Sequence, residues 1–348
     1  MACSVKEIRD ILIIKPSSLG DVVLALPALG ALRRSFPEAK ISWLIRSEFA
    51  PLLKEHPYLD DIIIFDRKYL GKAWYNPNAF SALVRLIQML RNSKYDVVID
   101  LQGLFRTASL GWLSGCKRRF GFSKAREFAE IFYTCKIERD ENSTHVVDYY
   151  LKVVEAVGAG DTAVEFVLPT DAESVDSVKK KLTERKIEGN NYAVFVPGSF
   201  HRSKCWPAER FGELAERITS QFGLPVVAVG TSSESDIVEE IQSRADVSIV
   251  NLAGGTGLNE LVELLRGARL VVSNDTGPGH IAAALGVPLV MMFSWSNPAR
   301  ILPYGRSECM VAKEPYDRGH KIKSSDPKHD ITAISVDDVY QKVCEQLA

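Results

Sequence analysis

The 348-residue chain lacks features that mark several common classes of protein. Pro or Gly interrupts its longest apolar stretches before they reach the ~20 residues that cross a bilayer, and its first ten residues carry charges where a signal peptide needs an apolar run. Its six scattered cysteines form no C-x-x-C pair, so we predict neither a zinc cage nor a disulfide framework. We therefore expect a soluble cytoplasmic protein with reduced thiols.

Several motifs that would identify a reaction are absent as well. The first turn after a strand has no G-x-G-x-x-G, which argues against a nicotinamide or flavin site, and the chain has no G-x-S-x-G of a nucleophile-elbow hydrolase. No D-x-D pair occurs and the histidines are not at metal-ligand spacings, so we expect no protein-held metal and no cofactor. A formal net charge of −1 argues against a nucleic-acid partner.

What the chain does have is an alternation of short β-branched runs with longer amphipathic stretches. Strand patterns occupy residues 11–15, 41–45, 62–65 and 96–100, and the series restarts in the second half at 192–198, 225–230, 247–254, 270–275 and 288–293. Apolar strands that are each followed by a helical stretch indicate parallel sheets covered on both faces. The sequence thus predicts an α/β fold of two doubly wound domains, with ligands in the cleft between them.

The domain boundaries are predicted from composition. The stretch near residues 165–190 is polar and highly charged, and we place the join there. We expect an N-terminal domain over residues 1–170, a second domain over 185–330 and a closing helix over 331–348. The polar segment 313–330 is expected to be an irregular connection.

Asp21 stands in "ILIIKPSSLGDVVLALPALGAL", where the first strand gives way to a helix. A glycine-rich turn at such a place usually wraps a phosphate, which a carboxylate would repel. One interpretation makes Asp21 a helix N-cap. The other makes it a functional group that faces the cleft, because the small residues Ser17, Ser18 and Gly20 let a ligand approach the backbone.

Two loops that follow strands of the second half carry further candidates. In "VPGSFHRSKCWP", backbone N–H groups, the Ser199 hydroxyl and Lys204 are gathered as in a pyrophosphate cradle, although Lys204 is also interpretable as an exposed loop lysine. In "GTSSESD", Glu234 is either an acid that starts a helix or an acceptor for nucleotide hydroxyls or amines.

The loop with the most candidate functional residues is "SNDTGPGHIAAALG". Asp275 and Thr276 can cap a helix, Gly277 lets a ligand approach the backbone, and His280 lies in the first turn. The free N–H groups of that helix would face an anionic ligand. A lone histidine in a helix is more often structural, but the company of Asp, Thr and Gly favours a functional histidine here.

Taken together these residues resemble glycosyltransferase family 9, the ADP-heptose:lipopolysaccharide heptosyltransferases. The strongest matches are "KPSSLGDVVLALPAL", "YDVVIDLQGLFRTA", "PGSFHRSKCWP" and "VVSNDTGPGHIAAALGVPLV", and the resemblance spans nearly the whole chain. "SSLGD" and "DLQGLFRTA" look more like heptosyltransferase I, which adds the first heptose to Kdo of the inner core, than heptosyltransferase II. Ser199, where the family often has Thr, and Cys205, where it has a polar or basic residue, depart from the pattern.

The resemblance implies a GT-B fold of two Rossmann-like domains, an inverting reaction without a D-x-D metal, an acceptor on the N-terminal domain and a nucleotide-sugar donor on the C-terminal one. Asp21 matches the family's general base, and Lys204 matches its diphosphate-contacting lysine. The remaining matches are to positions of the donor site, which are Ser199, Phe200, Glu234, Asp275, Thr276, Gly277 and His280, and to the acceptor side, which are Ser17, Ser18, Gly20, Gln102 and Arg106.

Basic residues gather in the first half of the chain, and two interpretations of them stay open. They are either a solvated face or a patch that holds a phosphorylated, acidic glycolipid acceptor at the cytoplasmic face of the inner membrane. The residues are Arg33, Arg34, Arg106, Lys117, Arg118, Arg119, Lys124 and Arg126. The alternatives to heptosyl transfer are a non-hydrolysing nucleotide-sugar epimerase, a GT-B protein of other sugar specificity and a binding protein without catalysis.

Overall fold

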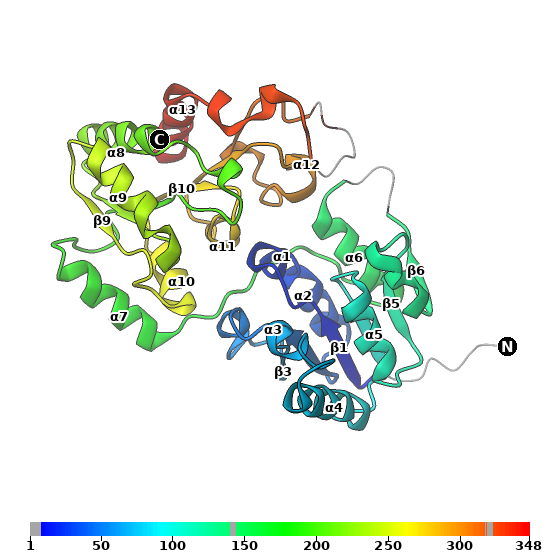
Figure 1. Cartoon of the computed structure of the whole chain (residues 1–348). Helices are drawn as coiled ribbons and strands as arrows, with labels where there is room; N and C mark the ends of the chain where they lie inside the picture. The colour runs from blue at the N-terminus through cyan, green and yellow to red at the C-terminus, as the bar shows by residue number, and fades with distance from the viewer. Residues whose placement is uncertain (1–7, 140–143, 317, 319–322) are drawn as a thin grey trace. The chain divides into compact units, whose positions relative to one another are not determined.

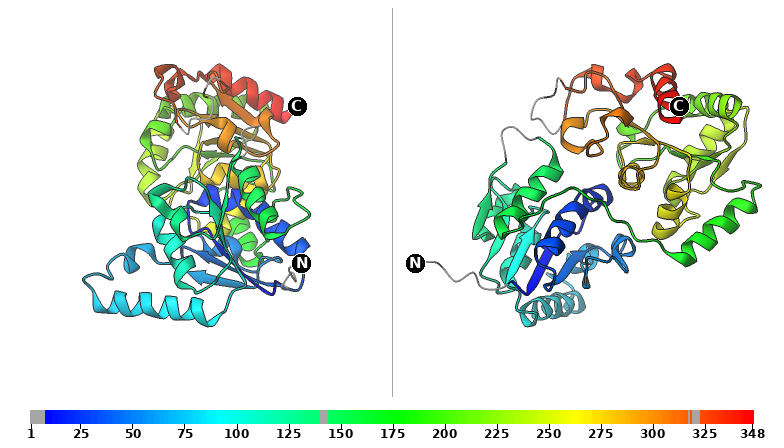
Figure 2. Two further views of the ribbon diagram at one scale, coloured as in Figure 1. Left: turned by 90° about the vertical axis from the view of Figure 1, so that its right-hand side faces the viewer. Right: turned by 180° about the vertical axis from the view of Figure 1, so that it is seen from behind.

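The computed structural model of the chain describes residues 8–139, 144–316, 318 and 323–348. The chain divides into two compact units, unit 1 (Met1–Pro169) and unit 2 (Thr170–Ala348). Each unit contains a six-stranded parallel sheet with helices on both faces (Figures 1 and 2). The predicted fold class, α/β with two doubly wound sheets, is confirmed.

Unit 1 alternates strands and helices along most of its length. Its elements are β1 (Asp10–Ile14), α1 (Leu19–Leu24), α2 (Leu26–Ser35), β2 (Lys40–Ile45), the 3₁₀ helix η1 (Ala50–Leu53), β3 (Asp61–Ile64), α3 (Arg67–Leu70), α4 (Pro77–Asn92), β4 (Val97–Asp100), α5 (Phe105–Leu113), β5 (Arg119–Phe122), the 3₁₀ segment η2 (Arg126–Phe132), β6 (Cys135–Ile137) and α6 (Val146–Val157).

Unit 2 repeats the alternation. Its elements are α7 (Ala172–Thr183), β7 (Ala193–Val196), η3 (Arg202–Lys204), α8 (Ala208–Phe222), β8 (Val226–Ala228), η4 (Ser232–Glu234), α9 (Ser235–Arg244), β9 (Ile249–Asn251), α10 (Leu258–Arg266), β10 (Leu270–Asn274), α11 (Gly277–Ala284), β11 (Leu289–Phe293), α12 (Pro298–Ile301), η5 (Ser307–Cys309), β12 (Met310–Ala312), η6 (Pro327–His329), η7 (Ile331–Ala333) and α13 (Val336–Leu347).

The two sheets have the same topology. Unit 1 orders its strands β3-β2-β1-β4-β5-β6, and unit 2 orders them β9-β8-β7-β10-β11-β12 when read from the equivalent edge. In each sheet the strand order reverses between the first and fourth strands of the unit. Ligands of open α/β sheets bind outside the carboxyl ends of the strands at such a reversal, so each unit has one expected binding position.

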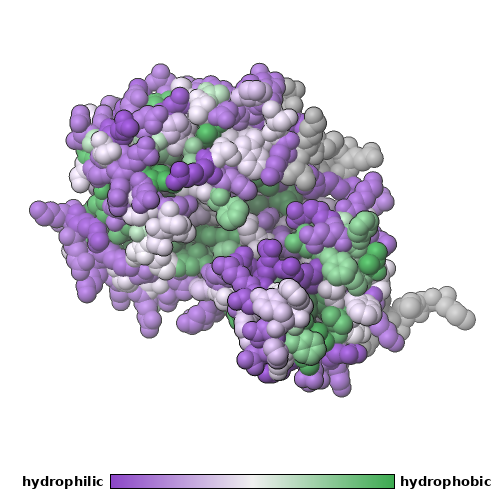
Figure 3. Space-filling view, in the orientation of Figure 1, coloured by the Kyte–Doolittle hydropathy of each residue, from purple (hydrophilic) through white to green (hydrophobic). Residues whose placement is uncertain are grey.

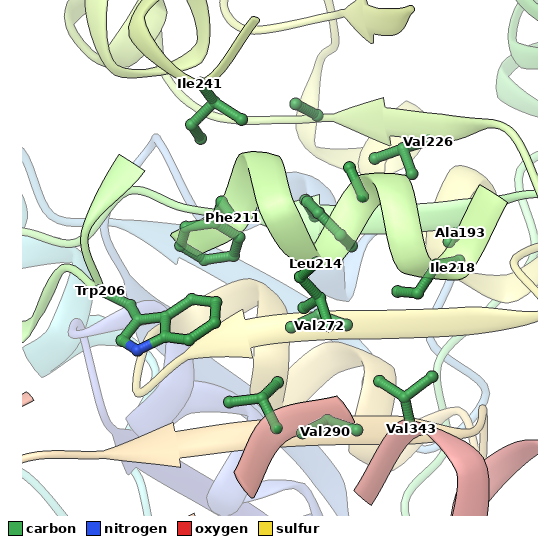
Figure 4. Packing of buried hydrophobic residues seen from close by; sticks show 14 of the residues in the cluster. Ala193, Trp206, Phe211, Leu214, Ile218, Val226, Ile241, Val272, Val290 and Val343 are labelled. Carbon is green, nitrogen blue, oxygen red and sulfur yellow. The ribbon is translucent and has the colours of Figure 1, made fainter. Parts of the chain in front are cut away.

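The core of unit 2 includes the last segment of the chain. Phe211, Leu214 and Ile218 lie on the buried face of the amphipathic helix α8, and they pack with strand residues and with Val343 of α13 (Figure 4). Phe211 is fully buried, and removing an aromatic ring at such a place costs about 3–5 kcal/mol. The indole N–H of Trp206 donates a hydrogen bond of 2.9 Å to the Ile334 carbonyl and ties the last segment to this core.

The charged stretch where the join is predicted contains a helix. Helix α7 follows Pro169, and its Val178 and Leu182 are buried. Lys181 of α7 pairs with Glu260 of α10 at 2.6 Å, so the helix packs within unit 2. Unit 2 contains α7 and the closing helix α13 as well as the elements between residues 185 and 330.

Three strands did not emerge from the sequence patterns. They are β5, β6 and β12, each of three or four residues. Strands this short carry few apolar residues to show a pattern, and β5 contains Arg119 and Gly121. Segment 313–330 is described only in part, and within it η6 forms a single turn.

Candidate functional site

The predicted site residues of each unit follow the two strands between which the strand order reverses. In unit 1, Ile14 of β1 is in register with Asp100 of β4, so Lys15 and Leu101 begin the two loops at the same edge. In unit 2, Val196 of β7 is in register with Ser273 of β10. The loops that carry Asp21 and Gln102, and those that carry Lys204 and Asp275, therefore start side by side.

Asp21 lies in the first turn of α1, and Ser18, rather than Asp21, is the N-cap. The Oδ2 atom of Asp21 accepts hydrogen bonds from the Ser18 backbone N–H at 3.1 Å and from the Ser18 hydroxyl at 2.8 Å. This capping box holds the carboxylate in place. The Asp21 side chain is 38% exposed, so it is open to a ligand rather than buried against its own sheet.

A buried lysine, Lys15, lies beside Asp21. Lys15 is almost inaccessible, and its Nζ atom lies 3.8 Å from Oδ1 of Asp21 and 5.3 Å from the centre of the Tyr150 ring. Burial lowers the pKa of Lys15, but the negative charge of Asp21 and the hydrogen bond with the Tyr150 hydroxyl outweigh it, and the net pKa lies above its usual value. Lys15 is therefore a permanent positive charge beside the carboxylate.

The loop after β4 is organised by a buried carboxylate, Asp100. It accepts hydrogen bonds from the backbone N–H of Gln102 and from the hydroxyls of Thr107 and Tyr133, at 2.8, 3.0 and 2.8 Å. Burial raises the pKa of Asp100 above its usual value, although these donors oppose the shift. The network fixes the loop that precedes α5.

The two loops of unit 1 are joined through Gln102. Its Oε1 atom accepts a hydrogen bond of 3.4 Å from the backbone N–H of Ser17, so Ser17, Ser18 and Gln102 lie around the same end of the sheet. Gly20 is buried within α1. Arg106 is exposed on α5 and is not among the groups that hold this loop in place.

In unit 2 the centre of the candidate site is Asp275, which is 5% exposed. Its Oδ2 atom lies 2.5 Å from the ammonium of Lys204 and accepts a hydrogen bond of 2.6 Å from the Ser296 hydroxyl. Burial raises the pKa of Asp275, but His280 and Lys204 outweigh it and hold the pKa well below its usual range. Asp275 is therefore ionised, and the buried pair fixes the position of Lys204.

His280 completes this cluster from the first turn of α11. Its Nε2 atom lies 3.7 Å from Oδ1 of Asp275. Within the described part of the chain, its buried Nδ1 atom has no hydrogen-bond partner, which is unusual for a buried polar atom. The structure thus brings together three residues predicted from two separate loops.

The ring of Trp295 packs against the ammonium of Lys204. The Nζ atom of Lys204 lies 4.6 Å from the centre of the Trp295 ring, and the indole N–H of Trp295 donates a 3.1 Å hydrogen bond to the Ser203 hydroxyl. The Nζ atom of Lys323 lies 4.3 Å from the same ring. Two ammonium groups therefore flank one indole, which concentrates positive charge where an anionic ligand would bind.

The other predicted residues of unit 2 occupy different positions. Glu234 closes the start of η4 by accepting hydrogen bonds from the N–H and hydroxyl of Thr231, at 2.7 and 2.9 Å. It also lies against Gly198, because a Cβ atom added there would be 2.1 Å from Oε1 of Glu234. Both interpretations of Glu234 are therefore compatible with its place, since the acid that starts the helix adjoins the loop after β7.

The remaining candidates differ in exposure. Phe200 is 95% exposed, and its ring contacts His201 rather than the Asp275 cluster. Ser199 is half-buried, and its carbonyl accepts a weak contact of 4.0 Å from the Cys205 thiol. Thr276 is the N-cap of α11 and Gly277 is its first residue, which places both beside Asp275.

Sequence reasoning missed several members of both clusters. Trp295 and Ser296 follow β11 directly, so the rule that polar residues after a strand form the site would have found them. Lys15 and Asp100 end apolar strands and carried the same signal. Tyr150 lies in the middle of α6, and no local pattern distinguishes it from an ordinary buried tyrosine.

The predicted basic patch is only partly assembled. Arg33 pairs with Asp60 at 2.5 Å and Arg34 with Asp161 at 2.8 Å, so both serve the packing of unit 1. Arg119 donates hydrogen bonds to the carbonyls of Phe132 and Cys116.

Among the helices of the described residues, none has both the length and the apolar character needed to traverse a bilayer.

Comparison with known proteins adds independent findings. The family model described as "Glycosyltransferase family 9 (heptosyltransferase)" matches residues 83–331. The chain is 26% identical to the lipopolysaccharide core heptosyltransferase OpsX of Haemophilus influenzae, over 87% of this chain and 84% of that protein. Among solved structures, a glycosyl transferase family 9 protein of Veillonella parvula has a TM-score of 0.83 at 24% identity, with 98% of each chain covered. The E. coli heptosyltransferase WaaC with ADP has a TM-score of 0.76 at 25% identity, covering 97% of this chain and 99% of that one.

Proposed function

The chain belongs to glycosyltransferase family 9, and we propose that it transfers a heptose from ADP-heptose to the Kdo-containing inner core of lipopolysaccharide. Its relatives include a lipopolysaccharide core heptosyltransferase and a heptosyltransferase solved with ADP. The observation that carries the proposal is the buried cluster of Lys204, Asp275 and His280 at the strand-order reversal of unit 2. "SSLGD" and "DLQGLFRTA" favour the first heptose addition, to Kdo, over later ones.

The donor is assigned to unit 2 because that unit gathers groups suited to a diphosphate. Lys204 supplies a cation, Lys323 supplies a second beside the same indole, and α11 presents the free N–H groups of its first turn next to Asp275. Leaving ADP gains negative charge in the transition state, and these groups stabilise that charge electrostatically. We propose that the reaction uses them in place of a protein-held metal.

The acceptor is assigned to unit 1, where Asp21 acts as the general base. Its carboxylate is held by Ser18 and lies 3.8 Å from the ammonium of Lys15, yet it stays accessible. The acceptor hydroxyl attacks the anomeric carbon, the bond from that carbon to the diphosphate oxygen breaks, and the hydroxyl proton passes to Asp21. Attack from the side opposite to the leaving group inverts the configuration at that carbon.

A transfer assay tests this proposal. Wild-type protein is incubated with ADP-heptose and a Kdo-bearing lipid acceptor, with UDP- and GDP-sugars as comparison donors, and the anomeric configuration of the product is determined by NMR. We expect transfer from ADP-heptose with inversion. Asp21→Asn keeps a capping oxygen for Ser18, and we expect it to lower kcat by ~10²–10⁴ while ADP affinity is retained.

Three results would contradict the proposal at different points. Near-normal turnover of Asp21→Asn would remove Asp21 from the role of base. Conversion of a nucleotide sugar without acceptor would indicate an epimerase, and strong preference for another nucleotide would overturn the donor. A thermal-shift series with the free nucleotides separates the last case from a missing acceptor, because a ligand that binds only the native state raises its stability.

A further inference from the structure

Trp295, in the loop after β11, contacts two lysine side chains of unit 2. The Nζ atoms of Lys204 and Lys323 lie 4.6 and 4.3 Å from the centre of its ring, so the two ammonium groups are no further apart than the sum of these distances. In the space-filling view, hydrophilic residues cover most of the visible surface of unit 2 (Figure 3). Charged side chains on such a surface are mostly solvated, so two cations on one indole require an explanation.

The indole is held in place by two other segments of unit 2. Its N–H donates a hydrogen bond of 3.1 Å to the hydroxyl of Ser203, in the loop after β7. The Trp295 carbonyl accepts a hydrogen bond of 2.7 Å from the backbone N–H of Ser324. The next residue, Ser296, pairs with Lys323 in an antiparallel bridge. Trp295 is half-buried, so its ring has a fixed place and keeps an accessible part.

The loop after β7 also contacts the indole through a second ring. The ring of His201 lies 5.6 Å from that of Trp295 in an edge-to-face arrangement, which is a favourable geometry for two aromatic rings. The loop that carries Lys204 is therefore attached to Trp295 by a ring contact as well as by the Ser203 hydrogen bond. The position of the Lys204 ammonium depends on this attachment.

The ammonium of Lys204 has three N–H groups to donate. One donates to Oδ2 of Asp275 at 2.5 Å, and the face of the Trp295 ring attracts the charge from another direction. The Lys204 side chain is 14% exposed, so part of the ammonium is open to a ligand. Asp275 and Trp295 together fix the direction of that open part.

Lys323 differs from Lys204 because it lacks a partner of opposite charge. Within the residues that the structure describes, its ammonium pairs with no carboxylate, and the Trp295 ring is the group that locates it. The two ammonium groups and the Asp275 carboxylate together carry one net positive charge. Like charges that lie close together repel, and an anion beside both ammonium groups relieves that repulsion. The arrangement suits an anion whose charge is spread over two neighbouring groups.

We propose that Trp295 is a positioning residue that holds the ammonium groups of Lys204 and Lys323 for the two phosphates of a nucleoside diphosphate. This role rests on the proposed function, because it takes unit 2 as the donor-binding unit. A monophosphate offers one phosphate to the two cations, so it gains less from their placement. Trp295 should therefore favour the binding of ADP over that of AMP.

Calorimetric titration of the full chain with ADP and with AMP tests this role. Trp295→Leu removes the aromatic face and keeps an apolar side chain. We expect it to bind ADP about tenfold more weakly and AMP at most about threefold more weakly. Trp295→Phe keeps an aromatic face, so its ADP affinity should lie within about threefold of the wild type. Disruption of the loop would weaken both nucleotides alike, so the ratio of the two affinities reports on positioning.

A double-mutant cycle tests whether Trp295 acts through Lys323. Lys323→Met alone should weaken ADP binding about fivefold, because a charge-assisted contact is lost. In the Trp295→Leu background the same substitution should have at most about a twofold further effect, since the ammonium is no longer held in place. Lys179→Met, exposed on α7, and Trp112→Leu, 52% exposed on α5, are the controls for loss of a lysine and of a tryptophan. Both controls should bind ADP like the wild type, and thermal unfolding checks that every variant is folded.

The possible results separate this role from the donor assignment. A wild type that bound neither ADP nor AMP would contradict the donor assignment and the role of Trp295 with it. If the wild type bound ADP, the role alone would be overturned by equal binding in Trp295→Leu or by proportional loss of ADP and AMP affinity. It would also be overturned if Trp295→Phe bound ADP no better than Trp295→Leu, or if the effects of Trp295→Leu and Lys323→Met were additive.

Discussion

The ammonium of Lys15 lies 3.8 Å from Oδ1 of Asp21, with the lysine buried and the carboxylate partly exposed. A buried cation is costly unless it is paired, so the fold has placed Lys15 where Asp21 and Tyr150 compensate it. The consequence is that Asp21 cannot be considered as a lone carboxylate. A lysine that follows β1 lies beside it.

Replacing Lys15 with Met tests this relationship. Met retains the apolar stem but removes the charge, so the carboxylate takes up a proton more readily, and the acidic limb of the kcat/KM profile should move to higher pH. We also expect a loss of about 1–3 kcal/mol in the free energy of unfolding, from the hydrogen bonds of the ammonium. Lys68→Met, at an exposed position on α3, is the control for general loss of a lysine. An unchanged acidic limb would show that Lys15 does not act on the base.

The buried pair of Lys204 and Asp275 allows stability and donor binding to be separated. Lys204→Met leaves a buried carboxylate without its cation, and breaking a buried pair costs about 3–5 kcal/mol. Adding Asp275→Asn removes that charge, so the double variant should recover part of the stability measured by thermal or denaturant unfolding.

Donor affinity should behave differently in the same variants. Calorimetric titration should show at least about tenfold weaker ADP binding for Lys204→Met, because a charge-assisted contact is lost, and no recovery in the double variant. If the double variant regained ADP affinity together with stability, Lys204 would be a structural residue and not a diphosphate ligand.

Gly198→Ala tests the place of Glu234. The added Cβ would lie 2.1 Å from Oε1 of Glu234, so the carboxylate must leave the position in which it caps η4. We expect about 1–3 kcal/mol of lost stability and weaker ADP binding. Gly160→Ala, where a Cβ would have nothing within 4 Å, is the matched control and should change stability by less than about 1 kcal/mol. Normal ADP affinity of Gly198→Ala would separate Glu234 from the nucleotide.

His56 should make the stability of unit 1 depend on pH. Its Nε2 atom donates to the Val167 carbonyl at 3.0 Å, and its Nδ1 atom accepts from the Tyr58 backbone N–H at 3.2 Å, which only the neutral ring can do. Burial lowers the pKa of His56 below its ordinary value of 6.5, despite the Val167 hydrogen bond. The unfolded chain therefore binds the proton more readily, so stability is complete above about pH 6.5 and falls as the pH drops through the folded-state value.

His56→Gln should weaken that dependence. The melting temperature of the wild type should fall between pH 7.5 and pH 5. That of the variant should fall less over the same range, since glutamine does not titrate. Other titrating groups are common to both proteins, so the difference between the two curves reports on His56. Parallel curves would contradict the assignment.

Much of the fold could be predicted because each long strand pattern was apolar and each long helix amphipathic. The strand-end rule also led to Asp21, Lys204 and Asp275, since a doubly wound sheet places such residues at one edge. The strand-end rule could not predict residues that reach this edge from other elements. Tyr150, from the middle of α6, is an example. Nor could composition distinguish Arg33, which pairs with Asp60, from exposed basic residues such as Lys117.

Helix α13 has a practical consequence for protein engineering. Val339 and Val343 are fully buried against α8 and the sheet of unit 2, and Ser335 caps the helix because its hydroxyl oxygen accepts a hydrogen bond from the Asp338 backbone N–H. Trimming the chain at residue 335 to obtain a shorter crystallisation target would uncover the interior of unit 2. The twelve residues of α13 should therefore be kept in any shortened form of the protein.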